Sequence, residues 1–255
     1  MKKITKAVIP AAGLGTRMLP IARTVPKEIL PIVDKPAISY LVDEAISSGV
    51  TDILIITNRG KYAIEDYFDY SPEYEETLRK KGKNDIIDSL RSAANRANIY
   101  FIRQKEARGL GDAVLRAKSF IGSEPFYVLY GDDIIMSEKP VCLQLAEAYD
   151  KYNLAVAGVK EVTAEQILKY SSLDAKPISG ESNFYHVTDM IEKPKPEEVI
   201  TRLSILGRVL LTPDIFDILS STKPGAGGEI QLTDAMRDLA QSKGMTAVDF
   251  EGTRY

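Results

Sequence analysis

A glycine-rich loop follows the first apolar run of the chain, in the segment PAAGLGTRMLP at residues 10–20. Gly13 and Gly15 have no side chains, and Ala11 and Ala12 have small ones, so the backbone N–H groups of this loop can approach a ligand closely. Such amides can cradle phosphate oxygens. The glycines by themselves are equally typical of a tight turn after a strand.

Two cations accompany the loop and could neutralise phosphate charge. The third glycine of a dinucleotide-binding fingerprint is absent after Thr16 and Arg17, and no Gly-Lys-Ser/Thr closes the loop as in a P-loop, so both motifs are absent. The guanidinium of Arg17 can hold two phosphate oxygens at once, whereas the ammonium of Lys27 acts as a point charge. Taken singly, each cation is equally consistent with a solvated surface position.

Polar residues with binding potential recur later in the chain. Asp132 follows an apolar run, and a carboxylate oxygen together with substrate phosphates suits Mg²⁺. Gln104 also follows a run, and its amide can donate and accept hydrogen bonds at once. Glu192 can accept two hydrogen bonds, and the neighbouring Lys193 can neutralise an anion. The simpler alternatives are a polar residue that ends a strand, an Asp that caps a loop, and an exposed charge pair.

Short apolar runs alternate with amphipathic stretches through the first 160 residues and would position these side chains. The runs are typical of strands buried on both faces and cover residues 6–10, 52–57, 99–103, 126–130 and 154–159. The stretches between them have helical spacing and cover residues 37–49, 85–97, 111–121 and 140–152. This alternation predicts a Rossmann-like, three-layer α/β domain with a mostly parallel sheet. Ligands of such sheets bind beyond the carboxyl ends of the strands.

The rest of the chain reads as one continuous domain over residues 1–255. The highly charged segment 71–96 predicts helices on the outside, and the looser pattern at about 164–203 predicts an excursion with short strands. The chain then returns with a strand at 203–211. Helices at about 213–221 and 231–243 and a strand near 246–250 complete the prediction.

Composition excludes several functional classes. The 255 residues are 44% hydrophobic and carry a net charge of -3, which provides no long-range field to recruit nucleic acid or an anionic membrane. No segment approaches the roughly 18 apolar residues that a membrane helix needs. Cys142 is the single cysteine and falls in an apolar helical pattern, so we expect it to be buried. A chain without an internal disulfide is typical of a reducing compartment, and we expect a cytoplasmic location.

Longer motifs identify a family. The segment PAAGLGTRMLP…VPKEILPIVDKP at residues 10–36 closely resembles the opening of bacterial UTP–glucose-1-phosphate uridylyltransferases, which belong to the sugar nucleotidyltransferase superfamily. The resemblance continues in family order with QKE at 104–106, GLGDAV at 109–114, GDD at 131–133, IEKPKP at 191–196, LTPDIF at 211–216 and PGAGGEIQLTD at 224–234. It spans nearly the whole chain and implies the nucleotide-diphospho-sugar transferase fold.

The resemblance implies a Mg²⁺-assisted transfer of the uridylyl group from UTP to glucose 1-phosphate, which yields UDP-glucose and pyrophosphate. The sugar phosphate already carries a nucleophilic oxygen, so catalysis reduces to in-line alignment and charge stabilisation at the α-phosphorus. In this family pattern Arg17 contacts the triphosphate, Lys27 steadies the developing charge and Lys193 neutralises the attacking phosphate. Asp132 is the implied metal ligand.

The resemblance also implies the residues that bind the two halves of the product. The nucleotide-binding set is Ala11, Ala12, Gly13, Gly15, Thr16, Gln104 and Gly109, with Gln104 reading the uracil edge. The sugar-binding set is Glu192, Gly228 and Glu229, with the carboxylate of Glu192 accepting hydrogen bonds from sugar hydroxyls.

Three positions depart from the family pattern. Family members usually carry His where Asp112 stands, and many carry Gly where Ser171 stands. In the family an Asp that completes the metal site with the carboxylate at Asp132, followed by a segment that helps subunits pack, comes after the Tyr that Tyr255 matches. Either the chain is truncated there or it is a divergent member with an incomplete metal site, and a homo-oligomer stays open. Two other functions also stay open: a related thymidylyl- or cytidylyltransferase, and a catalytically weak paralogue that regulates an active enzyme.

Overall fold

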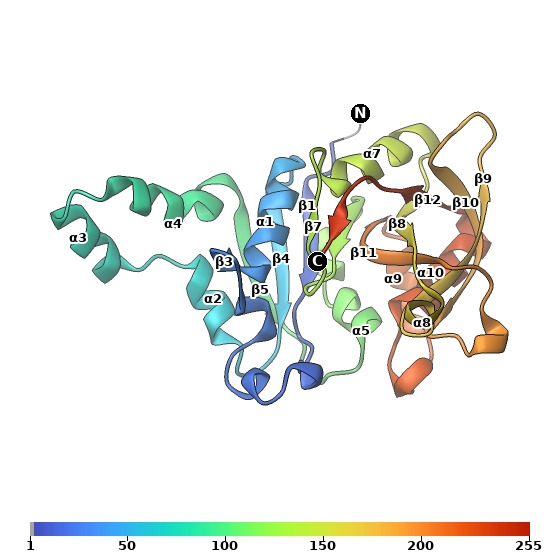
Figure 1. Cartoon of the computed structure of the whole chain (residues 1–255), viewed down its shortest axis with the longest axis horizontal. Coiled ribbons are helices and arrows are strands. Elements are labelled where there is room, and N and C mark those ends of the chain that lie inside the picture. The colour runs from blue at the N-terminus through green and yellow to red at the C-terminus, as the bar shows by residue number, and fades with distance from the viewer. Residues whose placement is uncertain (1–2) are drawn as a thin grey trace.

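The computed structural model describes residues 3–255, and its centre is one large twisted sheet (Figure 1). The strands are β1 (Lys6–Pro10), β4 (Asp52–Thr57), β5 (Asn98–Arg103), β6 (Phe126–Leu129), β8 (Ala155–Glu161), β9 (Ser171–Pro177), β10 (Phe184–Glu192), β11 (Leu203–Leu211) and β12 (Met245–Asp249). Their order in space is β5-β4-β1-β6-β11-β8-β12-β10-β9. The four strands β5, β4, β1 and β6 are mutually parallel, as the alternating pattern predicts.

The other half of the sheet is mixed. Strand β11 runs antiparallel to both β6 and β8, and β10 runs antiparallel to both β12 and β9. Within residues 3–255, the remaining strands of this sheet all point the same way, so the sheet is mostly parallel in strand direction. The predicted excursion forms β9 and β10, which are seven and nine residues long and longer than the short strands expected there.

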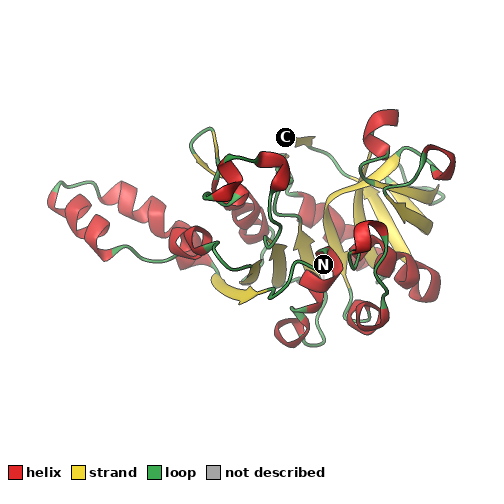
Figure 2. Cartoon of the chain, turned by 90° about the horizontal axis from the view of Figure 1, so that it is seen from below, coloured by secondary structure: helices red, strands yellow, loops and turns green. Residues whose placement is uncertain are grey.

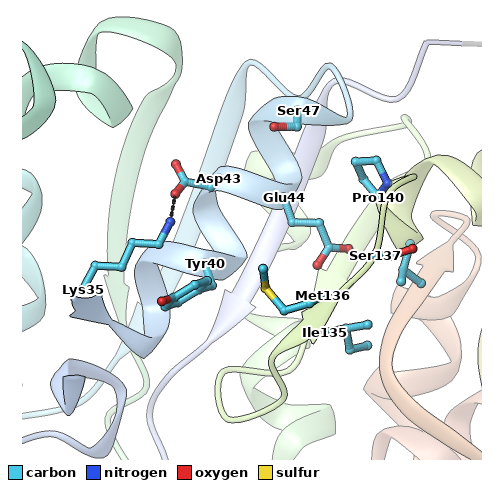
Figure 3. A pocket seen from close by; sticks show the side chains of 10 residues that line it. Lys35, Tyr40, Asp43, Glu44, Ser47, Ile135, Met136, Ser137 and Pro140 are labelled. Carbon is cyan, nitrogen blue, oxygen red and sulfur yellow. Dashed lines mark hydrogen bonds and ion pairs between the residues drawn. The ribbon is translucent and has the colours of Figure 1, made fainter. Parts of the chain in front are cut away.

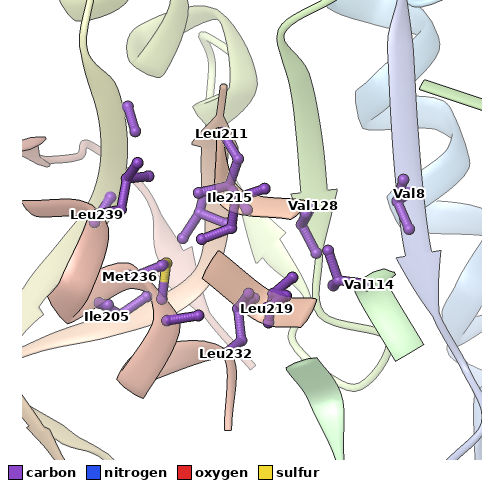
Figure 4. Packing of buried hydrophobic residues seen from close by; sticks show 14 of the residues in the cluster. Val8, Val114, Val128, Ile205, Leu211, Ile215, Leu219, Leu232, Met236 and Leu239 are labelled. Atoms are coloured by element: carbon purple, nitrogen blue, oxygen red, sulfur yellow. The ribbon is translucent and has the colours of Figure 1, made fainter. Parts of the chain in front are cut away.

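Helices cover both faces of the sheet and form the outer two of three layers. The helices are α1 (Ala37–Ser47), α2 (Tyr62–Phe68), α5 (Leu110–Leu115), α6 (Lys118–Ile121), α7 (Val141–Tyr152), α9 (Ile215–Ser221) and α10 (Leu232–Lys243). Alternate residues of β1 face opposite sides: Ala7 and Ile9 pack in the core with α1 and α7, and Val8 packs in the core with α5, α9 and α10 (Figure 4). This alternation is what a strand buried on both faces requires.

Several local elements differ from the sequence expectation. The helix expected over 111–121 is divided into α5 and α6 by a turn at residues 116–117. A hairpin of β2 (Pro31–Ile32) and β3 (Lys35–Pro36) is additional, as is the pairing of β7 (Ile135–Met136) with β13 (Thr253–Arg254). That last pairing brings the end of the chain back to the middle of the molecule (Figure 1).

The charged segment forms α3 (Pro72–Lys80) and α4 (Asn84–Arg96), which project from the body as an arm (Figures 1 and 2). This is the outside position predicted for it. Cys142 is buried in α7, also as predicted. Among the helices in residues 3–255, none combines the length and the apolar character needed to cross a membrane.

Candidate active site

A cavity of about 460 Å³ lies beyond the carboxyl ends of β1, β5 and β6. Of the residues predicted for function, its lining includes Ala12, Gly13, Gly15, Thr16, Lys27, Gln104, Gly109, Asp132 and Glu229. These residues come from five separate parts of the sequence and converge because parallel strands end at the same edge of a sheet. The geometry therefore unites the loop, the Lys27 cation, the Gln104 amide and the Asp132 carboxylate in one space.

The end of β1 and the turn after β6 approach each other very closely at Gly131. A Cβ atom at this position would lie 2.7 Å from the carbonyl oxygen of Pro10, which is too close for any residue but glycine. The contact sets the turn that carries Asp132 against the start of the glycine-rich loop. Gly131 thus explains structurally why the GDD segment begins with glycine.

Lys27 and Asp132 form the central ion pair of the cavity. The Lys27 Nζ atom lies 2.6 Å from Oδ2 of Asp132. Partial burial alone would raise the pKa of the Asp132 carboxyl, but the charge and hydrogen bond of Lys27 outweigh it, Arg17 adds to the effect, and the pKa falls below its usual range. Asp132 is therefore ionised near neutral pH. Arg17 lies in an exposed 3-10 turn (Thr16–Met18) outside the cavity lining, and only its charge reaches Asp132.

A buried ion pair between Lys61 and Glu28 holds the start of the glycine-rich loop in place. The Lys61 Nζ atom donates to both carboxylate oxygens of Glu28, at 2.7 and 2.8 Å, and to the carbonyl oxygen of Ala11 at 2.6 Å. Burial lowers the pKa of Lys61, and the neighbouring Glu28 carboxylate opposes that change. The N–H of Ala11 donates to the carbonyl of Ile56. Both backbone groups of Ala11 are thus engaged in the fold, and the structure does not bring this residue to the cavity.

Gln104 lies at the end of β5 with its amide held by two neighbours. Its Nε2 atom donates to the carbonyl oxygen of Gly109 at 3.1 Å and to Oδ2 of Asp112 at 2.8 Å. Its backbone N–H donates to the carbonyl of Thr57, which extends the β4–β5 ladder by one bond. The position of the Gln104 amide is therefore fixed by the fold.

Glu192, one of the predicted sugar-binding residues, contacts the start of α10. Oε2 of Glu192 accepts a hydrogen bond from Thr233 at 2.7 Å. Burial raises the pKa of the Glu192 carboxyl, Thr233 and Lys193 oppose this, and the negative charges of Asp234 and Glu229 raise it further. Glu192 therefore lies close enough to Glu229 to sense its charge, although Glu192 is not part of the cavity lining.

Lys193 follows Glu192 in a left-handed conformation with φ of 47°. Its N–H donates to the carbonyl of Tyr170 at 2.8 Å, and its half-exposed Nζ lies 4.0 Å from Glu192. Gly228 ends a 3-10 turn (Ala226–Gly228) with open space around it and also lies outside the cavity lining. Of this pair, Gly228 directly precedes Glu229, which lines the cavity, and Lys193 directly follows Glu192.

The donor set of the cavity suits a cation that takes most of its ligands from substrate and water. Within residues 3–255, no group of three or more His, Cys, Asp or Glu side chains could hold a metal ion by itself. Asp133 does not add a second carboxylate, because its Oδ1 accepts from Arg254 Nε at 2.6 Å. Mg²⁺ retains water and binds through one or two carboxylates plus phosphates, so Asp132 fits it.

A second cavity, of about 240 Å³, lies between α1 and β7 (Figure 3). Its lining includes Tyr40, Glu44 and Met136, and the Lys35–Asp43 ion pair closes one side. None of the residues predicted for function from the sequence lines it. The larger cavity is therefore the better candidate for the active site.

The residues that sequence reasoning missed are the supports of the cavity. Glu28 stands next to Lys27 in the motif. A charged residue in this mostly apolar segment could have indicated a buried ion pair. Lys61 and Arg254 gave no signal, since their partners lie 33 and 121 residues away in the sequence. Asp112 was noted only as a departure from a pattern, and its hydrogen bond to Gln104 required the structure.

Comparisons with known proteins agree with this geometry. A family model described as nucleotidyl transferase matches residues 6–254. The UTP–glucose-1-phosphate uridylyltransferase of Bacillus subtilis (strain 168) is 49% identical over 255 residues, which cover 100% of this chain and 87% of that protein. A crystal structure of UDP-glucose pyrophosphorylase complexed with UDP-glucose aligns with a TM-score of 0.90 and 42% identity over 99% of this chain and 92% of that chain.

A UTP-bound UGPase from Acinetobacter baumannii is also similar, with a TM-score of 0.89 and 33% identity over 99% of this chain and 88% of that chain. A putative glucose-1-phosphate thymidylyltransferase from Bacillus anthracis has a TM-score of 0.74 at 21% identity, over 98% of this chain and 88% of that chain. At that identity the likeness concerns the fold alone.

Proposed function

This chain belongs to the nucleotidyl transferase family, and we propose that it transfers the uridylyl group of UTP to glucose 1-phosphate, forming UDP-glucose and releasing pyrophosphate. The observation that carries the proposal is the cavity in which Gln104, Lys27 and Asp132 face one space. Full-length identity of 49% with a uridylyltransferase supports the choice of UTP and glucose 1-phosphate.

The reaction needs alignment and charge stabilisation more than acid–base chemistry. An oxygen of the sugar phosphate attacks the α-phosphorus, and the bond to pyrophosphate breaks on the opposite side. We assign the triphosphate to the glycine-rich loop and Arg17, and the charge that develops on the α-phosphoryl oxygens to Lys27. Mg²⁺ held by Asp132 and the phosphates would neutralise further charge. Since Lys27 pairs with Asp132, the cation is already fixed at the reacting end of the cavity.

The sugar phosphate is assigned to the side of the cavity near Glu229. There Glu192 would accept hydrogen bonds from sugar hydroxyls, and Lys193 would offset the charge of the attacking phosphate. Gly228 lets the chain approach the sugar without a side chain in the way. These assignments follow from the charges and the position of the residues beside the cavity.

The competing functions differ in measurable ways. A thymidylyl- or cytidylyltransferase would prefer another nucleotide, and the solved structure named for thymidylyl transfer is only 21% identical. A weak regulatory paralogue would bind nucleotide but turn over slowly, and the Lys27–Asp132 pair in the cavity speaks against it. We further propose that the chain acts in the cytoplasm as one domain; sedimentation of the purified chain would reveal a homo-oligomer.

The decisive experiment measures pyrophosphate release with glucose 1-phosphate, Mg²⁺ and each of UTP, dTTP and CTP. We expect the highest kcat/KM with UTP. An Asp132→Asn variant should lose about 100-fold or more in kcat, since the anionic ligand that would hold Mg²⁺ at the reacting phosphate is removed. Turnover with dTTP or CTP above that with UTP would favour a competing enzyme. Nucleotide binding without any pyrophosphate release would favour the regulatory paralogue.

A further inference from the structure

The amide of Gln104 lies between two oxygen atoms that can only accept hydrogen bonds. Its nitrogen contacts the carbonyl oxygen of Gly109 at 3.1 Å and Oδ2 of Asp112 at 2.8 Å. A carbonyl and an ionised carboxylate carry no hydrogen, so the NH₂ group of Gln104 must face them and its Oε1 must face away. The chemistry of the neighbours therefore decides which way this amide points.

Asp112 is held in the ionised form that this argument needs. It lies on α5 with 4% of its surface exposed, and the guanidinium of Arg116, one turn further along, bonds its other oxygen. Burial alone would raise the pKa of the Asp112 carboxyl, but the hydrogen bonds from Arg116 and Gln104 outweigh it and bring the pKa below its usual range. At neutral pH the carboxylate accepts and cannot donate.

Gln104 lines the cavity that we assign to the nucleotide, and Oε1 is the polar atom of its amide that Gly109 and Asp112 leave free. Within the described residues 3–255, no donor is recorded for its Oε1. The edge of uracil presents an N3–H donor, whereas cytosine presents a bare N3 acceptor at the same place. An oxygen at Oε1 can accept from uracil N3–H, but it would meet the lone pair of cytosine N3.

We propose that Asp112 is a specificity-determining positioning residue: it holds the Gln104 amide with Oε1 toward the base, so that UTP is accepted and CTP is rejected. The proposal rests on the uridylyl transfer proposed above. It adds that base choice depends on a residue that touches the amide and not the nucleotide.

The test compares kcat/KM for UTP and CTP in the Asp112→Asn variant. This change keeps the shape of the side chain, but its own NH₂ can face Gln104 while its oxygen faces Arg116. Only the Gly109 carbonyl then still favours the original orientation of the Gln104 amide, so turning it over to offer Nε2 to cytosine N3 costs less than in the unsubstituted chain. We expect the UTP-to-CTP ratio to fall by about tenfold or more, since an unpaired polar group at a base edge is costly. Asp112→Ala, which also leaves the Gly109 carbonyl as the one acceptor, should lower the ratio as well.

The matched control is Asp217→Asn, the same chemical change at an exposed carboxylate of α9 that pairs with Lys118 at 2.9 Å. It should leave the ratio unchanged. Equal losses with UTP and CTP in Asp112→Asn would show a merely structural role and overturn the proposal. If the unsubstituted chain releases no pyrophosphate, the uridylyl transfer fails instead, and calorimetric affinities for UTP and CTP test Asp112 separately.

A measurement on the unsubstituted chain covers a variant that does not fold. In a sample with ¹⁵N-labelled glutamine side chains, the Gln104 NH₂ protons should stay protected from solvent exchange before and after UTP binds, because their acceptors belong to the protein. Fast solvent exchange of these protons in the free protein, with protection only after UTP binds, would place the NH₂ group on the base and contradict the proposal.

Discussion

Lys27 occupies a cation position on Asp132 before any substrate arrives. Its ammonium pairs with the carboxylate at 2.6 Å, so the negative charge of the turn is already balanced. A metal ion that approaches Asp132 must therefore share this carboxylate with Lys27. The phosphates of a nucleotide would supply the additional negative charge needed to balance both cations. At the scale of single residues, the cavity favours joint binding of metal and nucleotide.

Lys193→Ala should reduce turnover with glucose 1-phosphate and leave UTP affinity nearly intact. Its ammonium is half exposed beside Glu192, and its proposed partner is the sugar phosphate alone. Loss of one preorganised charge should lower kcat by about 10- to 100-fold. Steady-state kinetics and UTP calorimetry measure the two effects separately.

Lys176→Ala, which removes an exposed lysine on β9, is the matched control and should retain activity. Normal sugar-phosphate kinetics together with lost UTP binding in Lys193→Ala would assign Lys193 to the nucleotide instead.

The sequence predicted the residues at strand ends better than their supports. Gln104 and Asp132 could be placed because each follows an apolar run, and parallel strands bring such positions together. The small side chain of Ala11 indicated that its backbone could approach a ligand, but the sequence did not show that its N–H and carbonyl bond to Ile56 and Lys61. Hydrogen-bond partners far apart in sequence carry no local signal.

A bulge in β11 positions the turn that carries Asp132. The register of β11 with β8 shifts between Ile205 and Val209, and Gly207 lies within that shift with φ of +68°. The carbonyl of Gly207 accepts from the N–H of Tyr130 at 2.8 Å. A single strand element on the far side of the turn thus sets where residues 130–133 lie.

Gly207→Ala should displace this turn and slow the reaction. An added Cβ would lie 2.5 Å from Cβ of Asp133, so the turn must move in addition to the strain of the left-handed backbone. We expect kcat to fall by about 10- to 100-fold, because small misplacements of reacting groups are costly. Pyrophosphate release at saturating substrates is the measurement.

Gly82→Ala isolates the backbone strain. Gly82 has a similar φ of +70°, but nothing lies within 4 Å of an added Cβ. This variant should lose only about 1 kcal/mol of stability and keep its turnover. Equal turnover of the two variants would show that the bulge does not position the catalytic turn.

The direction of β11 could not be predicted from its residues. Its apolar run identified a strand, and the observed bounds of 203–211 match the prediction. Whether a strand runs parallel or antiparallel depends on its neighbours in the sheet and on the path of the preceding segment. The spacing of apolar residues within the strand does not reveal either of these. The alternating pattern therefore predicted the parallel half of the sheet and left the mixed half undetermined.

At the scale of the whole molecule, a buried ion pair joins the helical layer that contains α1 to the sheet. Arg208 on β11 is 1% exposed and pairs with Glu44 of α1, 164 residues away, at 2.7 Å. The same guanidinium donates to the carbonyl oxygen of Asp133 at 2.8 Å. Arg208 therefore links α1, β11 and the catalytic turn, and its loss should affect both stability and activity.

Arg208→Met should destabilise the fold by about 3–5 kcal/mol, because it leaves the Glu44 carboxylate buried without its partner. Glu44 is 9% exposed, so little water can replace the guanidinium. The double variant Glu44→Leu/Arg208→Met removes both charges and should lose less than the single variant. Arg202→Met, which breaks the exposed pair with Glu161, is the matched control and should cost at most about 1 kcal/mol. Urea unfolding of the four proteins gives the comparison. If Arg208→Met costs no more than Arg202→Met, the buried pair does not hold α1 to the sheet, and the position of the catalytic turn must depend on its other contacts, at Gly207, Gly131 and Arg254.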